Sequence, residues 1–257
     1  MTAKTDGSLK HCFHLYRFLP GEQIMIIQRI LCIIIGYCFG LIQTGFLYGK
    51  MKGIDIREHG SGNSGATNTL RTLGTKAGFI VLFGDALKCI IAMLITYLLF
   101  GKANPEYRYL FMIYTAFGAV IGHDFPFYLN FKGGKGIAVT AGLIISFGPM
   151  FVAVHLGVFA LVFLTTHYVS LGSLLIYATF FVMMIICGQT GYFDKGGVII
   201  PEPLLTEMYV IIFIMTVIAY WRHRANIIRL LHHNESKVYL TEKLKKKTGK
   251  DKTDELV

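Results

Sequence analysis

Long apolar runs constrain the fold of this chain more than any other feature. They cover residues 24–48, 77–100, 108–129, 149–168, 170–190 and 205–221. A helix needs about 20 apolar residues to cross the hydrocarbon core of a bilayer, so each run predicts one membrane span. A charged fraction of only 16% and a mean hydropathy of +0.55 exclude an ordinary soluble enzyme of this length. The expected fold class is an all-α polytopic membrane protein.

A shorter apolar run at 137–147 leaves the number of spans open. Only Gly148 and Pro149 separate it from the next run, so 137–168 is either one kinked helix or a tight hairpin of two helices. The basic segments 49–76, 130–136 and 222–257 belong in the cytoplasm by the positive-inside rule. All three reach the cytoplasm only if 137–190 crosses the membrane three times. We therefore expect seven transmembrane helices, with the N-terminus outside and the C-terminus cytoplasmic.

The chain divides into an external polar segment (1–23), a membrane domain (24–235) and a basic cytoplasmic tail (236–257). About twenty mixed polar residues precede the first span and no convincing cleavage site follows it, so this span is expected to be retained. After Trp221, ten Lys and Arg residues face five Asp and Glu residues. Such juxtamembrane charge commonly sets topology and attracts anionic lipid headgroups. We expect contact with membrane lipid and none with nucleic acid.

Asp85 and Lys88 are charged residues inside the second apolar run. Residues at i and i+3 share a helical face, and placing either charge in hydrocarbon is energetically unfavourable. Two interpretations follow. The two side chains either pair with each other or face a polar cavity and support an active site there.

The first cytoplasmic segment, 60–71, is typical of an anion-binding loop. Its glycines let backbone N–H groups turn toward a ligand, its neutral side chains add donors, and Arg71 offers a planar guanidinium suited to phosphate. A short helix beginning near Asn68 would place Arg71 in its first turn. The alternative is a flexible linker. The candidate residues are Gly60, Ser61, Gly62, Asn63, Gly65, Thr67, Asn68 and Arg71.

The second cytoplasmic segment places lysines among glycines at the entrance of an apolar run, which again favours phosphate binding. Leu129 and Gly136 stand where a Walker A motif needs its first glycine and its Ser or Thr, so ATP hydrolysis is disfavoured. The candidates are Lys132, Gly133, Gly134, Lys135 and Gly136, with His123 upstream either as a site residue or as a helix-end hydrogen-bond former.

The third segment follows the last apolar run. His223, Asn226 and Arg229 recur every three residues, so a helix would carry all three on one face, and Glu235 lies beyond them. A solvated interfacial helix is the alternative. Three phosphate-compatible segments on one side of the membrane favour a shared site.

These motifs resemble the bacterial acyl-phosphate:glycerol-3-phosphate acyltransferase family. The resemblance covers nearly all of 24–235 and rests on GSGNSGATNTLR at 60–71, GHDFPFYLNFKGGKG at 122–136 and HRANIIRL at 223–230. It implies seven helices and transfer of an acyl group from acyl phosphate to the 1-hydroxyl of glycerol 3-phosphate, an early step of phospholipid biosynthesis. It also implies a bacterial inner-membrane location, no cofactor or metal, and contact with the enzyme that produces acyl phosphate.

By this resemblance the catalytic residues are Ser61, Arg71, Lys135, His223 and Asn226, while Glu235 and the glycine backbones shape the site. We expect direct attack by the glycerol hydroxyl, with His223 or a phosphate oxygen accepting its proton. An acyl-Ser61 intermediate is disfavoured because no carboxylate-oriented histidine partner is visible in the sequence.

The family usually has a glycine shortly before the terminal glutamate, where this chain reads His233-Asn234-Glu235. The turn there is expected to differ. The rival function is an organophosphate or anion transporter, since seven spans and phosphate-binding loops also suit transport. Clustering of the polar motifs on one side, away from the membrane midplane, argues against it.

Overall fold

A computed structural model of the chain describes residues 20–239, and the regular secondary structure in this range is helical, apart from one isolated β-bridge between Lys195 and Val198. Six of its helical stretches are long and apolar enough to cross a membrane, which confirms the predicted all-α polytopic class. Most of the segment 1–23 and of the tail 236–257 lies outside the described residues. The α-helices are α1 (Pro20–Gly40), α2 (Thr44–Met51), α3 (Ala66–Leu73), α4 (Thr75–Thr96), α5 (Arg108–Asp124), α6 (Ile137–Ser146), α7 (Pro149–Thr166), α8 (Val169–Gln189), α9 (Glu202–Arg222) and α10 (Arg224–Leu231).

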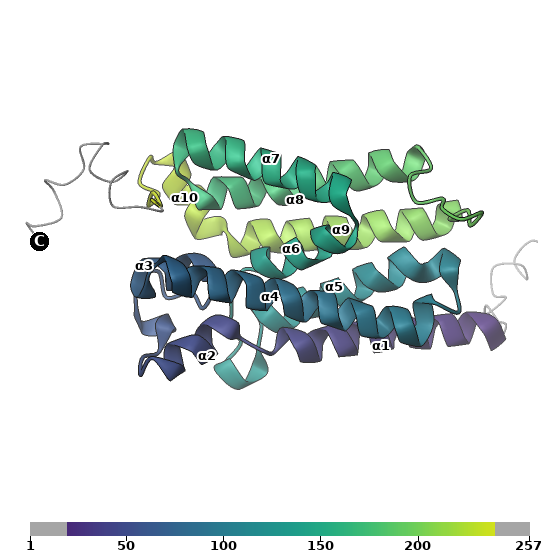
Figure 1. The fold of residues 1–257 in the computed structure, drawn as a ribbon, viewed down its shortest axis with the longest axis horizontal. Helices are drawn as coiled ribbons and strands as arrows, with labels where there is room; N and C mark the ends of the chain where they lie inside the picture. Colours follow the sequence, from purple (N-terminus) through teal and green to yellow (C-terminus); the bar gives the residue numbers. More distant parts are fainter. Residues whose placement is uncertain (1–19, 240–257) are drawn as a thin grey trace, which may run out of the picture.

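The long helices form an elongated bundle with two distinct ends (Figure 1). The short helices α2, α3 and α10 gather at one end, which we call the loop end. The first residues of α1 and the turn at 191–201 lie at the opposite end. The two ends of the described chain therefore lie at opposite ends of the bundle.

Glycines bring α1 and α5 into direct backbone contact. A Cβ on Gly36 would lie 1.9 Å from the Thr115 carbonyl oxygen, and one on Gly118 would lie 2.2 Å from the Ile33 carbonyl oxygen. Gly40 and Gly122 face each other in the same way. Small residues permit such close packing of membrane helices. The GxxxG step at 36–40 therefore serves packing, and it fixes where the motif that follows α5 leaves the bundle.

The first apolar run is broken, although its composition predicts one helix. α1 ends at Gly40 and α2 begins at Thr44. The break frees the carbonyls of Gly40 and Ile42, which accept hydrogen bonds from Lys88 Nζ at 3.3 and 2.6 Å. Lys88 also binds Asp85 at 2.8 Å, which confirms mutual pairing.

Residues 137–168 form two helices, which excludes the single kinked helix. The turn between α6 and α7 uses Gly148 at φ +108°, and Pro149 begins α7. The ten residues of α6 rise about 15 Å, roughly half of the hydrocarbon thickness. α6 is enclosed by its neighbours: a Cβ on Gly142 would lie 2.4 Å from the Ala86 carbonyl oxygen of α4.

An aromatic cluster fills the bundle between the end of α6 and the 191–201 turn. Phe147 at the end of α6 packs against Phe151 and Phe180 with ring centroids 5.2 and 5.8 Å away. Phe193 of the turn and Tyr109 at the start of α5 complete it, with their centroids 4.9 Å apart. This end of the bundle is therefore packed with side chains, whereas the polar motif segments occupy the loop end.

Candidate active site

Asn68 organises the first motif segment. Its amide nitrogen donates to the carbonyls of Ile56, His59 and Asn63 at 2.9–3.0 Å, and its amide oxygen accepts from the Ser61 N–H at 2.8 Å. The side chain is 2% exposed. Gly60 adopts φ +59°, and a Cβ there would lie 2.3 Å from the Asn68 amide oxygen. The loop is therefore held in one shape from inside, which contradicts the flexible-linker alternative.

The predicted position of Arg71 within its helix is wrong. α3 begins at Ala66, and the carbonyl of Gly65 accepts its first helical bond from Thr69 N–H, so Arg71 falls in the last turn. The reason is that the Asn68 side chain holds the loop carbonyls and does not begin the helix. Arg71 instead donates to the Ser236 carbonyl oxygen at 3.1 Å, which places its guanidinium beside the C-terminal segment.

The second motif segment rests on His123. The N–H groups of Gly133 and Gly134 donate to the carbonyls of Asp124 and His123 at 3.2 and 3.0 Å. A Cβ on Gly134 would lie 1.9 Å from His123 Nε2. Both glycines are therefore required for the loop to lie against the end of α5. This contact sets the position of the backbone immediately before Lys135.

The first two motif segments meet Arg222, the residue just before the third motif, at the carbonyl oxygen of Gly133. Asn63 of the first segment donates to it at 3.3 Å, and Arg222 at the end of α9 donates to it at 3.1 Å. Arg222 also reaches the Gly134 carbonyl at 2.6 Å and lies 3.9 Å from Asp124. One backbone atom thus joins parts of the chain that are far apart in sequence.

A chain of polar contacts runs from Lys135 into the third segment. Lys135 Nζ donates to Asn226 Oδ1 at 2.5 Å, and Asn226 Nδ2 donates to Glu235 Oε1 at 2.8 Å. Glu235 also accepts from Arg229 at 2.7 Å and from the Ser170 hydroxyl of α8 at 3.0 Å. Because Glu235 fixes Asn226 and Arg229, the side chain that Lys135 meets is itself held in place.

The electrostatics of this chain suit an anion. Burial, together with the neighbouring Arg229, lowers the pKa of Lys135 to about 8. Burial alone would raise the pKa of Glu235, but hydrogen bonds from Asn226, Arg229 and Ser170 outweigh it and lower that pKa. Glu235 is therefore a carboxylate. The cations around it exceed what one carboxylate neutralises, so an added phosphate group would be stabilised here.

His223 is a neutral imidazole with a defined tautomer. The side chain is 3% exposed, and burial followed by the nearby Lys135 charge lowers its pKa to about 4. Its Nδ1 lies 2.8 Å from the Ala219 carbonyl oxygen, so Nδ1 carries the proton and Nε2 keeps its lone pair. A neutral histidine with a free Nε2 lone pair can accept a proton.

The C-terminal residues 232–239 cover the loop end. The N–H of Val238 donates to the His167 carbonyl at 3.0 Å, and the Val238 side chain is 3% exposed. His233 adopts φ +57°, the left-handed region that favours glycine. His233 thus takes, shortly before Glu235, a backbone conformation that is usually occupied by glycine.

The predicted site residues differ in where the structure places them. The structure joins Asn63, Gly133, Gly134, Lys135, Asn226, Arg229 and Glu235 through the contacts described above, and it sets Arg71 and His223 beside them. Gly60, Gly62, Gly65 and Asn68 shape the first loop, and Ser61 lies exposed on it. Thr67 is half-buried, Lys132 is exposed, and Gly136 begins α6 at φ +72°. His123 is buried beneath the second loop. Within residues 20–239, no group of three or more His, Cys, Asp or Glu side chains is arranged to hold a metal ion.

Arg222 and Ser170 were missed from the sequence. Arg222 precedes the third motif and carried no signal beyond a basic residue at a helix end. Ser170 lies in an apolar run and looked like a tolerated small residue. Their contacts with the glycine loop and with Glu235 depend on helices that are distant in sequence.

The comparisons with known proteins agree with this geometry. Residues 30–233 match the family model described as glycerol-3-phosphate acyltransferase. The chain belongs to the glycerol-3-phosphate acyltransferase family. The matched range contains all three motifs in the order predicted and stops just before Glu235.

Similar members of the glycerol-3-phosphate acyltransferase family occur in several bacteria. The protein of Bacillus velezensis is 38% identical over 209 residues, which cover 81% of this chain and 96% of that protein. The protein of Mycoplasma pneumoniae is 36% identical over 227 residues, covering 81% and 94%. Both are named glycerol-3-phosphate acyltransferase.

Two solved structures of this family share the fold. One is PlsY, an integral membrane glycerol 3-phosphate acyltransferase, in its glycerol 3-phosphate form. It has a TM-score of 0.70 and 31% identity, and the match covers 84% of this chain and 98% of that one. The lysophosphatidic acid form has a TM-score of 0.67 and 30% identity, with coverage of 82% and 96%.

Proposed function

We propose that this chain transfers a fatty acyl group from acyl phosphate to the 1-hydroxyl of glycerol 3-phosphate, releasing lysophosphatidic acid and inorganic phosphate. The observation that carries the proposal is the meeting of the first two motif segments with Arg222, just before the third motif, at the Gly133 carbonyl, in a member of this acyltransferase family. Lys135 and Arg229 lie beside this point and are joined to Glu235, Lys135 through Asn226 and Arg229 directly. Two phosphate-bearing substrates need such an excess of positive charge.

The residues suggest direct transfer without a covalent enzyme intermediate. The glycerol hydroxyl oxygen attacks the acyl carbonyl carbon, and the bond to the phosphate oxygen breaks. The hydroxyl proton passes to His223 Nε2 or to a phosphate oxygen. Lys135 and Arg71 neutralise the charge on the phosphates, while Asn226 and the N–H groups of the first loop, near Ser61, supply donors to the oxyanion. Since phosphate is a good leaving group, the step needs no strong general acid.

The proposed topology has seven crossings, with the N-terminus outside and the active site and C-terminus in the cytoplasm of a bacterial cell, in its inner membrane. The first residues of α1 and the helix α10 lie at opposite ends of the bundle, which supports an odd number of crossings (Figure 1). The segments 49–76, 130–136 and 222–239 gather at the loop end, as the positive-inside rule expects of a cytoplasmic face. In this topology α6 and the turn after it count as the fourth crossing.

Phosphate release by purified protein in detergent tests the function. Palmitoyl phosphate with glycerol 3-phosphate should give phosphate and lysophosphatidic acid, whereas palmitoyl phosphate alone should not. Lys135→Ala and Ser61→Ala should abolish the reaction while the protein stays folded. Detergent removes all compartments, so a transporter would be silent in this assay. A folded wild-type protein that releases no phosphate under these conditions would contradict the proposal and lead to uptake assays in proteoliposomes.

A further inference from the structure

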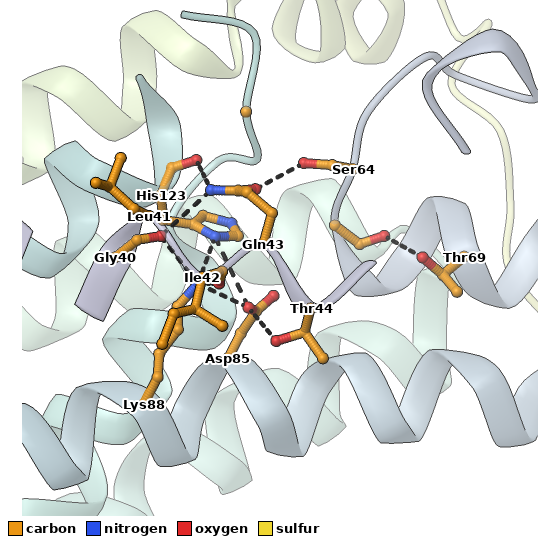
Figure 2. Close-up of polar contacts among 12 residues, drawn as sticks. Gly40, Leu41, Ile42, Gln43, Thr44, Ser64, Thr69, Asp85, Lys88 and His123 are labelled. Atoms are coloured by element: carbon orange, nitrogen blue, oxygen red, sulfur yellow. Dashed lines mark hydrogen bonds and ion pairs between the residues drawn. The ribbon is translucent and has the colours of Figure 1, made fainter. Parts of the chain in front are cut away.

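A buried polar cluster lies beneath the two glycine loops, at the break between α1 and α2. It consists of Gln43, Asp85, Lys88 and His123, drawn from the break, α4 and α5 (Figure 2). All four are at most 5% exposed. Burying charged and polar side chains in a membrane bundle is energetically unfavourable unless they pair with one another, and the members of this cluster do so. The cluster touches no residue that the proposed mechanism uses for chemistry.

Lys88 is the centre of the cluster. Its ammonium lies 2.8 Å from Asp85 Oδ1 and 3.0 Å from His123 Nδ1, and it caps the freed carbonyls of the α1–α2 break. An ammonium can only donate, so His123 Nδ1 accepts and the ring proton lies on Nε2. Thr44 at the start of α2 donates to the same Asp85 oxygen at 2.8 Å. Lys88 therefore fixes both the tautomer and the orientation of the imidazole.

His123 passes this constraint to the loop that bears Lys135. The ring lies against Gly134, where a Cβ would come within 1.9 Å of Nε2, and the His123 carbonyl accepts from the Gly134 N–H. A rotated imidazole would therefore displace Gly134. Lys135 is the next residue and would move with it.

Gln43 passes the same constraint to the first loop. Its amide nitrogen donates to the His123 carbonyl at 2.9 Å, and its amide oxygen accepts from the Ser64 hydroxyl at 3.1 Å. Ser64 is 1% exposed and lies next to Asn63, which donates to Gly133. Both glycine loops thus rest on one cluster.

We propose that Lys88 is a positioning residue for acyl transfer: held by Asp85, it fixes His123 under Gly134 and so places Lys135 for the transition state. The inference rests on the proposed function and adds a residue that acts without touching substrate. If Lys88 only capped the helix break, it would stabilise the protein and its loss would leave the chemistry of Lys135 unchanged. A positioning role predicts in addition that the loss of Lys88 lowers kcat.

The test compares purified Lys88→Met with wild type, using palmitoyl phosphate and glycerol 3-phosphate from pH 6 to 10. Displacing Lys135 removes charge stabilisation in the transition state, so kcat should fall tenfold or more with a smaller change in KM. Burial is the main cause of the lowered Lys135 pKa. A displaced, wetter Lys135 should therefore move the alkaline limb of kcat/KM to higher pH. Lys88→Arg, which keeps a cation and donors, should recover part of the lost kcat.

Arg29→Met is the matched control. Arg29 forms a partly buried ion pair with Glu207 at 2.7 Å, between α1 and α9 and away from the glycine loops. Its loss should lower the thermal unfolding midpoint while kcat and the alkaline limb stay as in wild type. If Lys88→Met behaves like Arg29→Met, the positioning role is wrong.

A double substitution tests the route through His123. His123→Phe keeps a ring under Gly134 but lacks Nδ1, so adding Lys88→Met to it should change kcat less than twofold. A further tenfold loss would contradict action through His123. If Lys88→Met does not fold, Lys88→Gln takes its place, because glutamine keeps a donor for the Ile42 carbonyl. Its kcat, KM and alkaline limb are then compared with those of wild type and Arg29→Met. If wild-type protein releases no phosphate, the proposed function is contradicted. If Lys88→Met is as active as wild type, only the positioning role of Lys88 is contradicted, so the two failures can be told apart.

Discussion

Lys135 is partly buried and lies near Arg229, Arg222 and Arg71. Under the proposed function, its protonation state sets how well it holds a phosphate. A pKa lowered to about 8 by burial and by Arg229 means that the charged form dominates below pH 8 and is lost as pH rises through that value. Among the groups of the candidate site described above, Lys135 therefore has the charge most sensitive to a change of pH near 8.

We expect kcat/KM, which reports the free enzyme, to fall as pH rises above about 8. Lys135→Arg carries a guanidinium that stays protonated, so its residual activity should keep its value to higher pH. The measurement is the pH profile of phosphate release for both proteins. An identical alkaline limb in the two would show that another group titrates there.

Arg222 offers a second residue-level prediction. Hydrogen bonds from a charged donor contribute about 1.5–3 kcal/mol, so Arg222→Gln should lower kcat/KM by tenfold or more by releasing the Gly133 and Gly134 carbonyls. Arg224→Gln is the control, since Arg224 is exposed and its side chain contacts the carbonyl oxygen and the ring of Trp221, at the end of α9. Equal activity of the two variants would contradict the role of Arg222.

At the scale of the elements, periodicity and hydropathy predict which segments become helices but not where they break. The run 24–48 is continuously apolar, yet α1 stops at Gly40 because Lys88 of another helix satisfies the freed carbonyls. Likewise, the first turn of α3 was misplaced because Asn68 uses its amide inside the loop. In both places a side chain, Lys88 from another helix or Asn68 within the loop, makes the hydrogen bonds to backbone carbonyls that a regular helix would make locally.

Close packing of α1 on α5 gives a prediction that belongs to these two helices. Gly36→Ala would put a Cβ within 1.9 Å of backbone, and overpacking of this kind costs about 1–3 kcal/mol. Its thermal unfolding midpoint in detergent should fall clearly below that of wild type. Gly157→Ala in α7 meets open space and should be neutral or slightly stabilising, since alanine favours helix. Equal midpoints would argue against glycine-dependent packing.

For the whole molecule, the three motifs could be assigned to one site from sequence because the basic segments share a predicted face. Their contacts could not. The pairing of Asn63, Gly133 and Arg222 depends on how α5 and α9 pack, and no local pattern encodes that packing. The sequence thus predicted the members of the site more completely than the atoms that join them.

Topology is tested on the whole molecule by labelling single cysteines in intact bacteria. In a background with the native cysteines replaced by serine, Lys195→Cys in the 191–201 turn should react with an impermeant maleimide added outside. Lys132→Cys in the glycine loop should react only after permeabilisation, because the proposed topology places the loop end in the cytoplasm. The reverse pattern would contradict the proposed orientation.

The junction at the Gly133 carbonyl also has a consequence for biogenesis. Translation runs from the N-terminus, so Asn63 and the glycine loop are made before Arg222 and Asn226. Until the last helix is inserted, the loop lacks the guanidinium that holds it and Lys135 lacks its amide partner. Under the proposed function, a chain interrupted before α9 should therefore be inactive, and a reactive acyl donor should meet a competent site only after α9 and the segment that follows it have been made.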